Sequence, residues 1–578
     1  MAEMNVANTT RSPMKQSSRQ SALRLATRPD FITAAALVLL AFLLGIVELA
    51  DGDIWWHLKT GQLIYERGHV PRTDWFTFTN PDSPWIDLHW GFQLIVAGLW
   101  ELGGTSALIL AKSAAGATTI ILGLLATRRG WSLWQSVACW LPALLLYSAR
   151  YLCRPEIVSA MLLAATLAIL FHVRRRPRLV WYLPLIQLIW INMHALFVLG
   201  WVVWAFFLAD AFSRKWWSAC VPASEQGDNR WRDWAGASTL MLVANVLNPY
   251  GWRGVMFPLT LFSRIQSGED RQFYQQLAGE FIGMGDYFHD NGLSVIFRYY
   301  PAFVFVVIAA MCLITFIGLL SKRRFSLFRA LLLVGFGYLV WQATRNTVPF
   351  AIVAGTVICW NAGDWRGHRN PQIRSRILAS RFALAFVISV LLFVVPTDLF
   401  SWYRRLPEIH TRPRLFGLGE TQFWYAHDSV KFLSQPKMPD RVVAMHLGHA
   451  ATVIFHNGPN QRVFADPRLE VNTKETLTKY LQFKRRLLEG PDGRGADFLL
   501  NEVDRNVSKM PALLVTTLEC LPVLANYQQW RLVFWDDAAA VFLYEPQARE
   551  LAIPPADRRR LATIFRRNMG AQPKESKE

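Results

Sequence analysis

The stretch FITAAALVLLAFLLGIVELADGDIWWHLKTG, residues 31–61, joins a long apolar run to a short group of acidic, aromatic and histidine residues. Its first part is an apolar run of roughly 20 residues, the length of a helix that crosses a bilayer core of about 30 Å. The run ends at Asp51 and Asp53, with two tryptophans and His57 directly after them. Charged groups at the edge of the hydrocarbon are costly unless they bind or react. The stretch therefore predicts a membrane helix that surfaces at a reaction site.

The composition of the whole chain agrees with a lipid environment. The 578 residues are 52% hydrophobic and include 25 Trp and 37 Phe. The formal net charge is +19, but the basic residues form short clusters between apolar runs instead of one continuous face, so we expect no nucleic-acid partner. The six cysteines show no CxxC spacing, and neither a disulfide framework nor a zinc cluster is predicted.

About eleven apolar runs are long enough, or nearly so, to cross the membrane. They begin near residues 31, 105, 131, 156, 179, 195, 235, 299, 325, 347 and 381. If residues 1–30 are a cytoplasmic tail, the basic clusters all fall at cytoplasmic turns, as the positive-inside rule requires. These clusters lie at 128–129, 174–176, 214–215, 322–324 and 366–381. We therefore predict an all-α polytopic bundle over residues 31–400, embedded in the lipid bilayer of the cell inner (plasma) membrane.

The first outer loop of this topology covers residues 51–104. Its apolar segment 90–103 is short for a span and carries Trp90, Trp100 and Glu101, which suit a helix lying in the membrane interface. We therefore predict that this segment does not cross the membrane.

The composition changes after Pro396, where short apolar stretches alternate with polar ones. The pattern predicts strands at 442–445, 453–456, 498–500, 532–534 and 540–543, and a helix at 473–488. The sequence thus predicts an extracytoplasmic α/β domain over residues 401–578.

Two pairs of Asp and His in the first outer loop are candidates for chemistry. Asp53 and His57 are four residues apart and share a face if they are helical, so the carboxylate can act as a general base or metal ligand beside the imidazole. The alternative is that Asp51 or Asp53 caps a short helix. Asp87 and His89 point the same way if their stretch is extended. The alternative for this second pair is a polar loop held by tryptophans.

Further candidates follow later spans on the same predicted face. Arg154 and Glu156 come after the third span, and a guanidinium there suits a phosphate or diphosphate. The alternative is an ion pair between these two residues. His194 and Arg345 stand at the ends of other spans, where a single polar residue is more often a helix cap or a satisfied polar group.

This order of acids and spans resembles the GT-C superfamily of membrane glycosyltransferases, which includes oligosaccharyltransferases, protein O-mannosyltransferases and the lipid A aminoarabinose transferase. In that superfamily an acidic residue follows the first span, and a second follows the third span, often within Arg-Pro-Asp. Here Asp53 or Asp51 matches the first acid, and Arg154-Pro155-Glu156 matches the second with Glu in place of Asp. The chain is also similar to bacterial polytopic membrane proteins of unestablished activity that carry Asp-x-Trp-Trp-His-Leu-x-Thr-Gly, here 53–61, and Pro-Arg-Thr-Asp, here 71–74.

The resemblance implies transfer of a sugar from a polyprenyl-phosphate donor to an acceptor whose identity the sequence does not give. Asp53, with Asp51 and Glu156 as further catalytic candidates, would deprotonate the acceptor, or Asp53 and Glu156 would fix an optional divalent cation. Arg154 and Arg345 would hold the leaving phosphate. His57, Asp87, His89 and His194 would position the substrates.

Two other functions remain alternatives to a transferase. The first is a non-catalytic protein that binds or exports a lipid-linked glycan, which needs the same cavity and arginines but no general base. The second, an ion-coupled transporter, is weaker because carboxylates within the spans are scarce.

Overall fold

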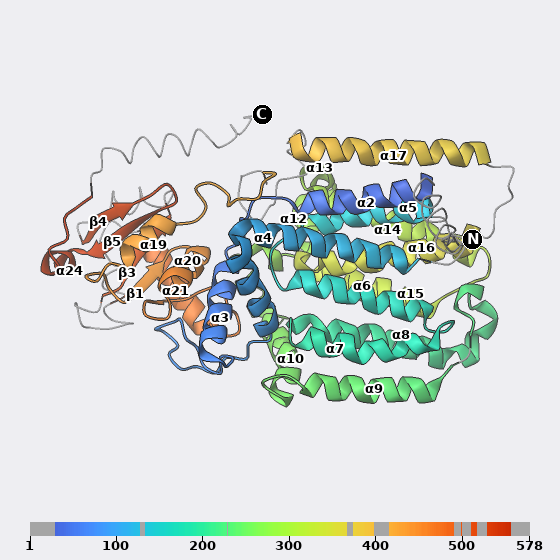
Figure 1. Cartoon of the computed structure of the whole chain (residues 1–578), viewed down its shortest axis with the longest axis horizontal. Helices are drawn as coiled ribbons and strands as arrows, with labels where there is room; N and C mark the ends of the chain where they lie inside the picture. The colour runs from blue at the N-terminus through green and yellow to red at the C-terminus, as the bar shows by residue number, and fades with distance from the viewer. Residues whose placement is uncertain are drawn as a thin grey trace, which may run out of the picture.

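The structure, a computed structural model, describes residues 29–127, 133–227, 229–266, 268–366, 374–397, 415–489, 499, 510–516 and 529–556. These residues form a bundle of long helices and a smaller α/β unit, with the first outer loop and the start of α4 between them (Figure 1). Residues 1–28 of the predicted cytoplasmic tail and the connection 398–414 lie outside the described residues.

Apolar sequence runs form the helices of the bundle. These are α2 (Pro29–Gly45), α4 (Trp90–Leu125), α5 (Leu133–Ser148), α6 (Glu156–His172), α7 (Leu183–Ile191), α8 (Val198–Trp217), α9 (Trp231–Val246), α14 (Tyr300–Leu320), α15 (Leu327–Gln342), α16 (Thr347–Arg366) and α17 (Arg374–Thr397). Within the described residues, the helices 90–125, 195–216 and 300–320 are long and apolar enough to cross a membrane, and others are apolar but shorter. The number of about eleven spans therefore stays a prediction.

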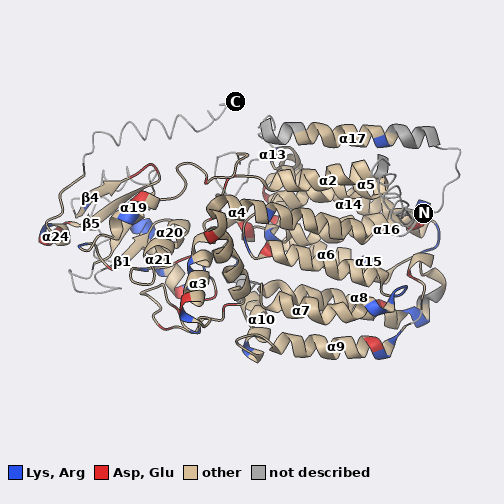
Figure 2. Ribbon diagram, viewed as in Figure 1, with Lys and Arg blue, Asp and Glu red and all other residues tan. Residues whose placement is uncertain are grey.

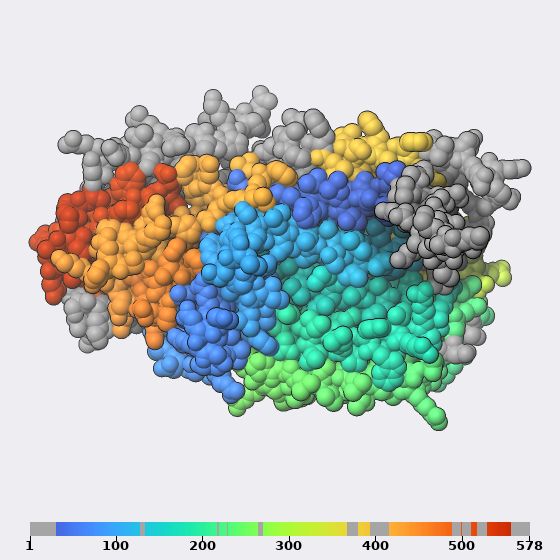
Figure 3. Space-filling view, viewed as in Figure 1, coloured from blue at the N-terminus to red at the C-terminus, as the bar shows by residue number. Residues whose placement is uncertain are grey.

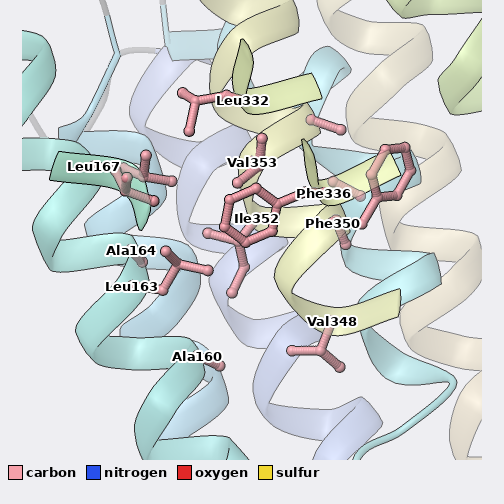
Figure 4. Close-up of a cluster of buried hydrophobic side chains, with 14 of the residues drawn as sticks. Ala160, Leu163, Ala164, Leu167, Leu332, Phe336, Val348, Phe350, Ile352 and Val353 are labelled. Carbon is pink, nitrogen blue, oxygen red and sulfur yellow. The ribbon is translucent and has the colours of Figure 1, made fainter. Parts of the chain in front are cut away.

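Helix α16 lies at the centre of the bundle. It is buried on nearly all sides from Thr347 to Gly363, as expected for a helix that is apolar all round. Figure 4 shows Ile352 and Val353 among side chains of α6 and α15. Because α6 packs on this rigid core, the residues at its first turn have fixed positions.

Helix α4 is interrupted at Gly103 and Gly104, which divide it into two segments. Gly104 has φ +55° and ψ −142°, a conformation that a residue with a Cβ rarely adopts. The helix packs on α3 (Ile54–Arg67), α2 and α6. Gly61 of α3 lies against Gln93 and Ala97 of the first segment, and Gly45 of α2 lies against Ser113 of the second. The break separates the predicted interfacial segment from the bundle helix that follows.

The α/β unit contains one five-stranded sheet with the order β2-β1-β3-β5-β4. The strands are β1 (Arg441–Ala444), β2 (Arg462–Val463), β3 (Ala512–Thr516), β4 (Trp530–Trp535) and β5 (Ala539–Tyr544). β1 pairs in parallel with β2 and β3, whereas β5 is antiparallel to β3 and β4. The helices of the unit are α19 (His427–Leu433), α20 (Leu447–Asn457), α21 (Lys474–Glu489) and α24 (Glu545–Glu550).

Most predicted elements of this unit agree with the structure. The strands at 442–445, 532–534 and 540–543 are found, and so is the helix at 473–488. The strand predicted at 453–456 is wrong, because these residues belong to α20. The strand predicted at 498–500 lies largely outside the described residues.

A buried ion cluster joins the first outer loop to the α/β unit. Nη2 of Arg468 lies 2.7 Å from a carboxylate oxygen of Asp74 and 2.5 Å from one of Asp466, and all three side chains are inaccessible to solvent. The guanidinium also lies over the ring of Trp85 at 4.4 Å. The space-filling view shows the loop and the unit in close contact (Figure 3). The α/β unit is therefore held against the loop that carries the candidate site.

Candidate active site

The site begins where α2 has ended and α3 starts. Asp51 is buried, and one of its carboxylate oxygens accepts a hydrogen bond from the backbone N–H of Asp53 at 3.2 Å. The hydroxyl of Tyr425, from the α/β unit, donates to the backbone carbonyl of Asp51 at 2.9 Å. Asp53 directly precedes α3, but its side chain makes no capping hydrogen bond. Asp51 therefore has the more firmly fixed side chain of the two, and Asp53 does not cap α3.

Arg154 connects the two aspartates to the helical bundle. Its Nε lies 2.9 Å and 3.1 Å from the carboxylate oxygens of Asp51, and its Nη2 lies 3.3 Å from Asp53. Its Nη1 lies 3.0 Å from Glu280 of the short helix η5 (Gly279–Phe281). Residues from three distant parts of the chain thus meet at one guanidinium.

Glu156 and Glu280 extend the cluster toward α16. Arg150 lies 2.8 Å from Glu280 and 3.4 Å from Glu156. Arg345 lies 3.3 Å from Glu156 and 3.7 Å from Glu280. Arg150 is almost fully buried, whereas the side chain of Arg345 is 29% exposed. Arg345 is thus the more weakly held and the more accessible of these two guanidiniums.

Asp53 and Glu280 have different pKa values because their surroundings differ. Burial raises the pKa of Asp53 to about 7, even though Arg154 acts to lower it. Burial also acts to raise the pKa of Glu280, but Arg150, Arg345 and Arg154 together hold it well below its usual range. At neutral pH Glu280 is therefore ionised, while Asp53 exchanges a proton readily.

A second group of polar residues lies beside this cluster. The ring centroids of His57 and His89 are 5.5 Å apart, and those of His89 and His194 are 5.4 Å apart. A ring nitrogen of His89 lies 3.4 Å from Asp87 and 3.9 Å from Glu470 of the α/β unit. The structure therefore brings all four of these predicted positioning residues together.

The protonation of the three imidazoles differs. Burial would lower the pKa of His89, but the hydrogen bond with Asp87 and the charge of Glu470 raise it above its ordinary value. Burial and the nearby His89 lower the pKa values of His57 and His194 well below the ordinary value. His89 is thus the most readily charged member of the group.

The contacts of Arg154 and of the Asp87–His89 pair distinguish between the alternatives that the sequence left open. Arg154 pairs with Asp51, Asp53 and Glu280, and no ion pair joins it to Glu156 within the described residues. Asp87 and His89 do lie together, but not on an extended strand: the backbone N–H of His89 donates to Asp87 at 3.0 Å, at the turn that starts α4.

Two acids of the site were not predicted from the sequence. Glu280 belongs to a long loop with several other acids, and Glu470 belongs to the α/β unit. The predicted topology places the long loop 248–298 on the same face as Asp53, and this placement was the only sequence signal for Glu280. No local pattern distinguishes either residue.

The divalent cation suggested for Asp53 and Glu156 stays a prediction. Each carboxylate faces a guanidinium at 3.3 Å, Arg154 for Asp53 and Arg345 for Glu156. In the part of the chain that the structure describes, no three Asp, Glu, His or Cys side chains are arranged to hold a metal ion. Both carboxylates are paired with guanidiniums in this arrangement, and the proposed reaction assigns no step to a cation.

Comparison with known proteins finds similarity in structure only. No protein-family model and no curated protein matches the sequence. The oligosaccharyltransferase of Archaeoglobus fulgidus in its apo form superposes with a TM-score of 0.53 at 12% identity, over 84% of this chain and 69% of that chain.

Two further solved structures are similar. The oligosaccharyltransferase AglB of the same archaeon, in complex with an inhibitory peptide and a dolichol-phosphate, gives a TM-score of 0.53 at 12% identity, over 86% of this chain and 71% of that chain. ArnT of Cupriavidus metallidurans, bound to undecaprenyl phosphate, gives a TM-score of 0.47 at 14% identity, over 90% of this chain and 98% of that chain. Over most of its length the chain thus has the same overall fold as the archaeal oligosaccharyltransferase.

Proposed function

We propose that this chain is a membrane glycosyltransferase that moves a sugar from a polyprenyl-phosphate donor to an acceptor hydroxyl at the outer face of the membrane. The observation that carries the proposal is the position of Asp53, a carboxylate with a pKa of about 7, beside the guanidinium of Arg154. The similar archaeal oligosaccharyltransferase was solved with a dolichol-phosphate, which supports a polyprenyl-phosphate donor.

In the proposed reaction Asp53 is the general base. It takes the proton of the acceptor hydroxyl while the hydroxyl oxygen attacks the anomeric carbon. The bond from that carbon to the phosphate oxygen breaks, the electron pair leaves with the phosphate, and the configuration of the sugar inverts. A base with a pKa near the working pH suits this step.

Arg345 is the first candidate to bind the leaving phosphate. Its contacts with Glu156 and Glu280 are long, at 3.3 Å and 3.7 Å, and part of its guanidinium is accessible. Arg154 has shorter contacts and holds both aspartates in place. Negative charge on the phosphate grows in the transition state, so a preorganised cation there lowers the barrier.

The direct test is release of polyprenyl phosphate from a panel of polyprenyl-phosphate sugars by the purified protein. Asp53→Asn keeps the size of the side chain but cannot accept the proton, so we expect turnover to fall by about 10²–10⁴. The matched control is Asp82→Asn, an exposed aspartate of the same loop, which should retain full turnover.

A second variant separates catalysis from binding. Arg345→Ala removes a charge-assisted contact worth about 1.5–3 kcal/mol, so KM for the donor should rise by about tenfold or more. A non-catalytic glycan-binding protein would instead lose affinity with Arg345→Ala and tolerate Asp53→Asn. Full cellular function of the Asp53→Asn protein at normal expression would therefore overturn the proposal.

A further inference from the structure

A groove between helices lies at the end of the bundle opposite the candidate site. Helices α4, α6, α7 and the short helix η1 (Pro177–Tyr182) border it, and its volume is about 670 Å³. Helix α6 has 17 residues, from Glu156 at the candidate site to His172 at the groove. A rise of 1.5 Å per residue separates these ends by roughly 25 Å. The end of the groove at His172 is therefore far from the site, and no residue of the site belongs to the lining.

The walls of the groove are apolar, and its floor consists of small residues. Ala165 and Ala168 are three residues apart on α6, so they share the face that lines the groove. The apolar wall is completed by Leu122, Leu125, Ile169, Leu179, Leu185, Ile186 and Ile189. Leu125 and Leu185 are more than half exposed at the outside of the bundle. A groove of this size and lining suits a hydrocarbon chain that enters from the bilayer.

One end of the groove is cationic. Arg176, His172 and Thr127 line this end, and no carboxylate belongs to the lining. Arg176 is exposed and makes no ion pair with any residue that the structure describes. Its neighbour Arg174 differs, because its guanidinium lies 3.1 Å from Asp210. Arg176 is thus available for an external anion.

We propose that this groove binds an anionic phospholipid of the bilayer, with its phosphate on Arg176 and one acyl chain along Ala165 and Ala168. Basic pockets between membrane helices at the cytoplasmic side are suited to such head groups. The positive-inside rule places the cluster 174–176 on the cytoplasmic side. A phospholipid is favoured over the donor lipid because the phosphate of the donor is proposed to bind at the other end of α6.

The test measures phosphatidylglycerol binding to the purified full-length protein by native mass spectrometry, with phosphatidylcholine as the zwitterionic reference. Phosphatidylglycerol should bind at least tenfold more tightly than phosphatidylcholine. Arg176→Ala should weaken phosphatidylglycerol binding about tenfold, as expected for one charge-assisted contact. Arg178→Ala, an exposed arginine outside the groove lining, is the matched control and should bind as the unaltered protein does.

A second variant tests the chain-binding part of the groove. Ala168→Trp fills the floor and should reduce binding of both lipids without touching Arg176. Equal binding of the two lipids, or unchanged phosphatidylglycerol binding by Arg176→Ala, would overturn the proposal. Displacement of phosphatidylglycerol by equimolar polyprenyl phosphate would overturn it too, since the groove would then serve the donor lipid. The choice of a phospholipid over the donor lipid rests on the proposed function, but sugar-transfer activity is not part of the readout, so failure of the one proposal can be distinguished from failure of the other.

Discussion

Asp51 and Asp53 are two residues apart, yet their carboxylates have different surroundings. Asp51 is nearly inaccessible and is bound by Arg154 through both oxygens, whereas the side chain of Asp53 is 23% exposed and has one longer contact to the same guanidinium. A general base needs a free oxygen that can reach the substrate. We therefore assign the base to Asp53 and a positioning role to Asp51.

The pKa of Asp53 predicts how the rate of sugar transfer depends on pH. Only the deprotonated carboxylate accepts a proton, so kcat/KM should increase as the pH increases through about 7 and then level off. The bound donor phosphate adds negative charge, which should move the corresponding rise in kcat to higher pH. Initial rates between pH 5 and pH 9 check this. A flat profile in that range would contradict the assignment of Asp53.

The break in helix α4 can be tested by substituting its glycines. Gly104 has a positive φ of 55°, so Gly104→Ala should destabilise the protein by about 1–2 kcal/mol or straighten the helix. Gly98 lies in the regular part of the same helix with no neighbouring atom where a Cβ would stand, so Gly98→Ala should be neutral or stabilising. Thermal unfolding in detergent compares the two. Equal effects would show that the break does not depend on Gly104.

Local sequence patterns predicted most of the helices and strands, and the incorrect predictions have physical reasons. The segment 90–103 was predicted to be separate from the span that follows because of its length and its tryptophans, and α4 is interrupted at Gly103 and Gly104. Its position in the membrane interface stays a prediction. The run 453–456 was predicted as a strand but is part of α20. A short apolar run looks the same in a buried strand and a buried helix, and only the surrounding packing decides.

The whole molecule determines the parts of the site that the sequence could not predict. The contact between Arg154 and Glu280 joins residues 126 positions apart, and Glu470 reaches His89 from the α/β unit. No local spacing encodes such contacts. The matched acids Asp53 and Glu156 were found because they follow spans, and the fold brings span ends at one face together.

The buried ion cluster between the first outer loop and the α/β unit can be tested by removing Arg468. Arg468→Ala would leave Asp74 and Asp466 as buried, unpaired charges, so the protein should lose about 3–5 kcal/mol of stability. The control is Arg549→Ala, an exposed arginine of the same unit. Limited proteolysis should cut the Arg468→Ala protein faster between the bundle and the sheet. Unchanged resistance would show that apolar packing alone holds the unit.

The ion pair between Asp74 and Arg468 also determines when the first outer loop can fold during biosynthesis. Arg468 follows Asp74 by 394 positions, so the loop with the Pro-Arg-Thr-Asp segment is made long before the guanidinium that neutralises it. At about 5–20 residues per second, the ribosome needs roughly 20–80 s to cover that distance. During this interval the aspartate must stay hydrated, because burial without a cation is costly. The first outer loop can therefore reach its final conformation only after Arg468 has been synthesised.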